Sequence, residues 1–232
     1  MIYRLSAFAV LGLAALTALP AAARPIRHHA HSADAQAATS AAPQETGVSG
    51  DSAPDWVPSP MQQRAAAAVA KAYFAAIDAG KFNQAYTLTS PLTRRAVPLA
   101  QFTADHKDAR EQTGALVKRV TNKMTFTKDP DSAPVKGIYV SVDFSARYAN
   151  ADRDCGYVVL YQKRDGLPFE VMRAENNFLT NDKAKEIADA AAEAPAPKKS
   201  GLFGKKDVKT PDTPDKAWAK IAANCPNYTP VP

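Results

Sequence analysis

The sequence has few of the residues on which enzyme and redox chemistry usually depend. Its two cysteines, Cys155 and Cys225, are not in a C-x-x-C arrangement, which argues against a thiol–disulfide oxidoreductase. Four histidines occur in 232 residues. A Ser-His-Asp order, a nucleophile elbow and a paired-carboxylate motif are all missing. We therefore expect a protein that is not an enzyme and that has no cofactor and no metal centre.

Long apolar runs are also missing, except close to the N-terminus. Arg4 precedes an apolar run at 5–19, which is shorter than the roughly 20 residues that a bilayer span requires. Small residues follow at 21–23, as in a secretory signal peptide. We expect cleavage near Ala23 and a periplasmic location. No cysteine follows the cleavage site, so we expect no lipid anchor.

Large apolar side chains are scarce in two further stretches, 24–58 and 195–213. Such composition cannot bury enough surface to offset the entropy of ordering a chain, and it predicts disordered linkers. The block between them, 59–180, has the size of a single domain. A short helix is expected at 181–194, and the C-terminal segment at 214–232 contains another.

The second linker is basic, in a chain whose formal net charge is +6. Its lysine pairs, Lys198 with Lys199 and Lys205 with Lys206, flank two apolar residues. This pattern favours contact with an anionic membrane or wall polymer, at about 1 kcal/mol for each lysine near the surface. The alternative is a solvated tether. Nucleic acid is not an expected partner, because export separates the chain from it.

The two cysteines suggest a disulfide in the oxidising compartment that the leader predicts. A bond between Cys155 and Cys225 would close a loop of about 70 residues and contribute up to about 4 kcal/mol. It would attach the C-terminal segment to the domain. The competing interpretation is two free thiols, one of them reactive.

Helical periodicity occupies the first half of the 59–180 block. Ser59 is a good N-cap and Gln62 completes a capping box, which predicts a helix that ends near Ala79. A shorter helix is expected at 81–88, and a third between Pro98 and Gly114.

A period of two follows and predicts strands at 116–127, 138–148, 157–163 and 169–178. In the first of these, alternation places Arg119 on the face opposite to the apolar side chains. Helices grouped before an antiparallel sheet predict an α+β fold, in which four antiparallel strands curve around the first helix.

These elements resemble a known family in four stretches. They read AYFAAIDAGKFNQAY at 72–86, RRAV at 94–97, REQTGALVKR at 110–119 and GIYVSVDFSARYAN at 137–150. The chain resembles, over about residues 61–179, the domain-of-unknown-function family 4019 of small exported bacterial proteins. The resemblance implies a nuclear-transport-factor-2-like, cystatin-like cone. It implies no catalytic residue.

The last predicted strand holds the main candidate site. Its apolar face, which includes Val171, continues as Arg173 and Glu175. If this face lines the mouth of the concave sheet, the two residues could contact a ligand, together with Asp143 or Arg147. The alternative is a solvated ion pair at the end of a strand, which contributes little.

Histidines offer two weaker candidates. His106 follows Phe102 by four residues, so a packing role on the third helix competes with a role as general base. His28, His29 and His31 could bind Zn²⁺ or Cu²⁺ loosely, although a plain polar spacer explains them better.

Together these observations favour a non-enzymatic interaction or small-ligand-binding domain. Two alternatives stay open: an envelope-associated accessory protein whose basic tail contacts an anionic surface, and an enzyme that uses the interior of the cone. A homodimer formed through the exposed sheet face also stays open.

Overall fold

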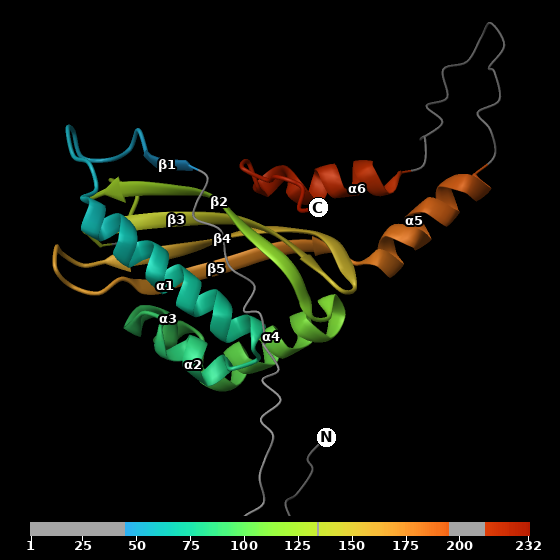
Figure 1. Cartoon of the computed structure of the whole chain (residues 1–232), viewed down its shortest axis with the longest axis horizontal. Helices are drawn as coiled ribbons and strands as arrows, with labels where there is room; N and C mark the ends of the chain where they lie inside the picture. Colours follow the sequence, from blue (N-terminus) through green and yellow to red (C-terminus); the bar gives the residue numbers. More distant parts are fainter. Residues whose placement is uncertain (1–44, 134, 195–211) are drawn as a thin grey trace, which may run out of the picture. The chain divides into compact units, whose positions relative to one another are not determined.

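The computed structural model describes residues 45–133, 135–194 and 212–232. Within these ranges the strands form one five-stranded sheet, in which strands follow one another in chain order (Figure 1). Helices α1 to α4 lie between the first two strands in sequence, and the predicted α+β class is confirmed. The strands are β1 (Glu45–Val48), β2 (Leu116–Lys128), β3 (Ile138–Tyr148), β4 (Ala151–Gln162) and β5 (Glu170–Leu179).

The prediction of four antiparallel strands is wrong, because β1 adds a strand that runs parallel to β2. β1 lies in 24–58, where composition predicts a disordered linker. It is short and mostly exposed, and it is held by backbone pairing to β2 and by an ion pair of 2.9 Å between Glu45 and Lys123. Such a strand depends on its neighbour, so its own residues do not reveal it. β4 also begins earlier than predicted, at Ala151 rather than Tyr157.

Two of the helices begin at serines whose side chains cap the helix N-terminus. Ser59 and Gln62 form the predicted capping box: the Ser59 hydroxyl accepts from the Gln62 backbone, and the Gln62 side chain accepts from the Ser59 backbone. Ser90 caps a helix that was not predicted by accepting from the Thr93 backbone at 3.1 Å. The helices are α1 (Pro60–Asp78), α2 (Phe82–Thr87), α3 (Pro91–Ala96) and α4 (Leu99–Thr113).

The apolar core lies between these helices and one face of the sheet, called the inner face. Phe126, Val140 and Leu160 of the sheet are fully buried there. Phe74 of α1 meets Phe144 of β3 edge to face, with ring centroids 5.0 Å apart. Burial of each such side chain contributes about 1.5–3 kcal/mol, so this layer holds the helices on the sheet.

Two irregularities in β2 change which side chains reach the inner face. The register against β3 shifts between Leu116 and Lys118, and again between Thr121 and Lys123. Each bulge reverses the alternation of side chains. Arg119 lies between them and is therefore on the inner face, where it is only 8% exposed. The prediction that it lies opposite the apolar side chains is wrong.

A third irregularity, in β5, moves charged side chains away from the inner face. The adjacent β4 residues Val159 and Leu160 pair with Arg173 and Val171, so β5 has one extra residue at this point. Val171 stays in the core, whereas Arg173 and Glu175 move to the other face of the sheet, called the outer face. The predicted continuous face of the last strand is therefore interrupted by a bulge.

The C-terminal segment packs on the outer face. After α5 (Asn181–Glu193), the described chain resumes with α6 (Pro214–Ile221) and a 3₁₀ turn (Ala222–Asn224). Cys155 of β4 is bonded to Cys225, with a sequence separation of 70 and Cα atoms 6.1 Å apart, which is the pairing that the sequence predicts. In the described ranges no helix is long and apolar enough to cross a membrane.

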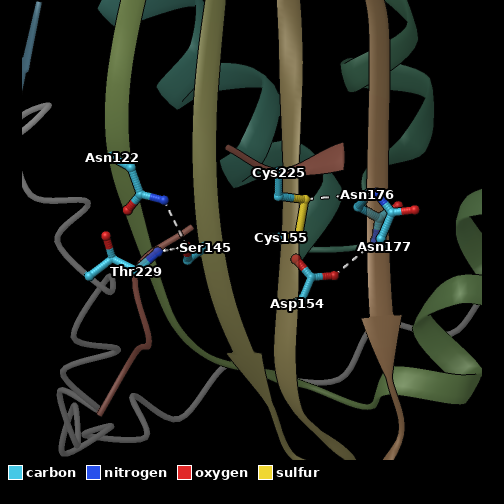
Figure 2. The surroundings of a disulfide bond; sticks show 8 residues. All are labelled: Asn122, Ser145, Asp154, Cys155, Asn176, Asn177, Cys225 and Thr229. Atoms are coloured by element: carbon cyan, nitrogen blue, oxygen red, sulfur yellow. Dashed lines mark hydrogen bonds between the residues drawn. A yellow bond between two sulfur atoms is a disulfide. The ribbon is translucent and has the colours of Figure 1, made fainter. Parts of the chain in front are cut away.

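Polar contacts extend the attachment made by the disulfide. Figure 2 shows Ser145 of β3 accepting hydrogen bonds from the Thr229 backbone at 3.1 Å and from Asn122 at 2.7 Å. Trp218 is buried against Cys155 and contacts the ring of Tyr228 at 5.1 Å. The first 44 residues, which include the predicted signal peptide, and residues 195–211 of the predicted linker at 195–213 lie outside the described residues.

Candidate functional site

A cavity of about 90 Å³ lies at the inner face, between the sheet and helices α1 and α4. Its wall combines aromatic rings with ionisable and hydrogen-bonding groups. The residues on which its chemistry depends are Tyr73, Phe74 and Asp78 of α1, His106 and Arg110 of α4, Arg119 of β2, Phe144 and Tyr148 of β3, and Asn176 of β5. Side chains from five elements therefore converge on one space, as in binding sites.

Arg119 is the central charged group of this wall. It forms an ion pair with Asp78 and donates from Nη2 to the Tyr148 hydroxyl at 2.7 Å. Its guanidinium lies 4.6 Å from the Phe74 ring centroid and 5.2 Å from that of Phe144. Burial raises the pKa of Asp78, although the adjacent guanidinium acts against this rise. A buried charge requires such partners, so the cluster fixes the position of Arg119.

One donor of this cluster is not used. The Nε atom of Arg119 is buried and has no hydrogen-bond partner among the residues that the structure describes. A buried donor without a partner costs about 1–3 kcal/mol, and more where the group is charged. Arg119 also lines the cavity, so the wall contains a residue whose buried donor is unsatisfied.

A buried carboxyl group lies in the same row of the sheet. Arg119 pairs with Ala146 across β2 and β3, and Ala146 pairs with Asp154 across β3 and β4. Asp154 is fully buried, and its Oδ2 accepts from Asn176 at 3.0 Å (Figure 2). Its Oδ1 has no partner in the described part of the chain. Burial raises the pKa of Asp154 to about 6.

His106 forms another part of the wall. Its Nε2 is 3.4 Å from the Tyr73 hydroxyl, and its ring contacts Phe102 edge to face at 4.3 Å and stacks on Phe82 at 6.0 Å. Burial lowers the pKa of His106, so the ring is neutral at pH 7. His106 therefore packs among aromatic rings, as one of the two sequence interpretations holds, and also lines the cavity.

The sequence-predicted site residues lie on the outer face, away from this wall. Arg173 forms an ion pair with Glu175, and their side chains are 60% and 44% exposed. Tyr157 donates to Glu175 at 2.6 Å and pairs across the strands with Asp143. Three of the four predicted residues are thus close together, while Arg147 lies further along β3. The structure does not bring Arg173, Asp143 or Arg147 to the inner cavity, and only Glu175 borders its opening.

A second hollow lies near these residues, between the outer face and the C-terminal segment. It has a volume of about 360 Å³ and is lined by Asp143, Tyr157 and the stretch 224–228. Its charged group is already engaged, since Asp143 accepts from Asn227 at 2.6 Å and from Ser141 at 2.9 Å. This hollow therefore presents fewer free polar groups than the inner cavity.

Apart from His106 and Glu175, the polar and charged residues that form the inner wall are not among the sequence-predicted candidates. Tyr148 carried a usable signal, because it occupies the apolar phase of the predicted second strand. Asp154 lies in the part of β4 that was not predicted, where polar residues obscure the alternation. Asp78 at the end of α1 and Arg119 have no local pattern that marks them as partners.

The structure adds little on metals or on the basic tail. Among the described residues, no group of three or more His, Cys, Asp or Glu side chains could hold a metal ion. His28, His29 and His31 lie outside these residues, as do the lysines at 198–206.

Comparison with known proteins gives one match. Residues 69–170 match the model of a family described as a protein of unknown function, DUF4019. This range begins inside α1 and ends at the start of β5, so it contains Asp78, Arg119, Tyr148 and Asp154. No curated protein and no solved structure matches the chain significantly. The chain therefore carries a domain that belongs to the DUF4019 family.

Proposed function

We propose that this domain binds a small molecule in the cavity beside Arg119 and that it is not an enzyme. The observation that carries the proposal is the Nε donor of Arg119, which is buried in a cavity wall and has no partner among the described residues. A ligand with a hydrogen-bond acceptor would satisfy this donor and recover its desolvation cost.

The surroundings of Arg119 support binding. Asp78 and Tyr148 hold the guanidinium from one side, and the rings of Phe74 and Phe144 hold it from another. A group fixed in this way loses little side-chain entropy when a ligand arrives, which favours affinity.

The same surroundings argue against catalysis. His106 is the histidine of the wall, and its Nε2 faces the Tyr73 hydroxyl, whose pKa burial raises far above neutral pH. Arg119 remains charged and cannot exchange protons with a substrate. Asp154 would be the remaining acid or base, and it lies behind Asn176 rather than in the wall itself.

We further propose that the protein works in the periplasm after cleavage of its leader, and that the domain is a cystatin-like cone. The apolar run at 5–19 and the disulfide between Cys155 and Cys225 support export into an oxidising compartment. Packing of α1 against the inner face supports the cone.

The test is a titration of the disulfide-bonded protein with cyclopentanone and with methylenecyclopentane, followed by amide NMR. Resonances of residues lining the cavity are expected to shift. The variant Ala109→Leu places a larger side chain in the wall and is expected to abolish these shifts. Ala104→Leu is the matched control, because Ala104 is exposed on the same helix.

Two outcomes would contradict the proposal. One is that neither probe shifts the resonances of residues around the cavity. The other is an identical response of the wild type and Ala109→Leu, because binding would then lie elsewhere.

A further inference from the structure

The charges around the cavity limit the kind of acceptor that Arg119 can accommodate. The guanidinium carries one positive charge, which its ion pair with Asp78 already balances. The carboxyl of Asp154, in the same row of the sheet, adds a negative charge when it is ionised. The buried part of the site is therefore neutral or negative before a ligand enters.

Two more charged residues line the opening. Arg110 and Glu175 carry opposite charges, and both are exposed to solvent. Arg110 donates to the backbone carbonyl of Asp78, and Glu175 is engaged by Arg173 and Tyr157 on the outer face. Both lie in water at the opening, where solvent and salt screen their charges, so they do not change the sign of the buried site.

An anionic ligand that reached Arg119 would therefore be desolvated without gaining an unpaired cation in the buried part of the site. A carboxylate that reached Arg119 would share the guanidinium with Asp78 and would be repelled by it at close range. An uncharged oxygen acceptor would gain the hydrogen bond from Nε without this repulsion.

The rest of the wall suits an apolar body. Phe74, Phe144 and Tyr73 contribute rings, and Val158 and Ile77 contribute aliphatic surface. The cavity volume of about 90 Å³ limits the ligand to a small molecule.

From these observations we infer that the ligand is a small uncharged molecule with an oxygen acceptor, such as a ketone or an amide, whose apolar part rests on the aromatic wall. The inference rests on the proposed function, because it specifies the ligand of the same cavity. The acceptor points at Arg119 Nε, and Asp78 and Asp154 exclude carboxylates.

The experiment compares three probes of similar shape at pH 7.5, by titration followed with amide NMR. Cyclopentanone is uncharged and has an acceptor, methylenecyclopentane has no comparable acceptor, and cyclopentanecarboxylate is an anion. We expect cyclopentanone to bind about tenfold more tightly than either of the others, since one charge-assisted hydrogen bond is worth about that ratio.

Charge variants then test the reason for the preference. Asp78→Asn keeps a side-chain oxygen for Arg119 but removes the negative charge, and is expected to raise the affinity for cyclopentanecarboxylate by about tenfold or more. Asp154→Asn also removes a negative charge, from a position behind the cavity wall, and should likewise raise the affinity for cyclopentanecarboxylate. Asp189→Asn is the control, because it removes a carboxylate from the exposed Lys185–Asp189 pair of α5, which does not line the cavity, and it should leave the preference unchanged.

The outcomes separate the inference from the proposed function. Equal binding of cyclopentanone and methylenecyclopentane, or tighter binding of cyclopentanecarboxylate to the wild type, would overturn the inference while leaving a binding cavity. Failure of all three probes to bind in the cavity would overturn both. An unchanged preference in both Asp78→Asn and Asp154→Asn would show that charge does not select the ligand.

Discussion

The sheet carries an arginine–carboxylate pair on each of its faces, and the two differ in surroundings rather than in chemistry. On the inner face, the side chains of Arg119 and Asp78 are 6% and 20% exposed, and aromatic rings and a tyrosine hydroxyl surround them. On the outer face, the side chains of Arg173 and Glu175 are 60% and 44% exposed. The outer pair has water around it, while the inner pair has only its protein partners.

The comparison shows why the predicted site and the observed site are different. The sequence points to the outer pair because its charged residues continue an apolar strand. The buried pair is the one next to a cavity with an unused donor. In low dielectric surroundings each partner depends strongly on the other, whereas solvent screens the exposed pair.

The largest expected effect comes from breaking the inner pair. Asp78→Ala leaves Arg119 buried without its carboxylate, and should lower the free energy of unfolding by about 3–5 kcal/mol. Urea denaturation monitored by fluorescence measures this loss. A loss below about 1 kcal/mol would mean that the inner pair contributes as little to stability as an exposed pair.

The next effect concerns the attachment of the outer face. Replacing both Cys155 and Cys225 with alanine removes a link that closes a loop of about 70 residues, and should cost up to about 4 kcal/mol. Hydrogen exchange should increase mainly in residues 214–232, because the apolar core on the inner face does not include the disulfide. An equal loss of hydrogen-exchange protection in α1 would show that the disulfide also stabilises the inner face.

The raised pKa of Asp154, on the inner face, predicts that the free energy of unfolding depends on pH. Its folded-state pKa of about 6 is above the ordinary aspartate value of 3.8, so the folded state holds the proton more tightly. The stability from this group is fully present below about pH 4 and is lost as pH rises through 6, by roughly 3 kcal/mol. Asp154→Asn should remove this dependence.

Urea denaturation of the wild type and Asp154→Asn at pH 4.5, 6.0 and 7.5 measures the effect. The stability of the variant relative to the wild type should increase with pH. The raised pKa of Asp78 acts in the same direction in both proteins and cancels in the difference. A stability difference between the two proteins that stays constant from pH 4.5 to 7.5 would contradict a raised pKa of Asp154.

The smallest effect is expected for the outer pair. Replacing Arg173 and Glu175 together with alanine should change the free energy of unfolding by less than about 1 kcal/mol, because exposed pairs contribute little. Thermal and urea denaturation of the double variant measure it. A larger loss would mean that the Tyr157 hydroxyl, which donates to Glu175, has a structural role on this face.

Much of the fold could be predicted because it depends on local signals. Ser59 and Gln62 specify the start of α1 within a few residues, and alternation along 138–148 specifies β3 and its buried side chains. The cysteine pair needed only the compartment that the leader predicts. β1 could not be predicted in the same way, because it exists as a strand only against β2.

The sequence by itself determined the start of α1, the segments of β2, β3 and β5, and the two cysteines that join the C-terminal segment to the sheet. Tertiary structure alone decided which arginine is buried, because bulges in β2 and β5 turn Arg119 inward and Arg173 outward. A bulge is set by how a strand pairs with its neighbour, and a shift of one residue moves each following side chain to the other face. The pattern of apolar and polar residues along one strand contains no record of that pairing.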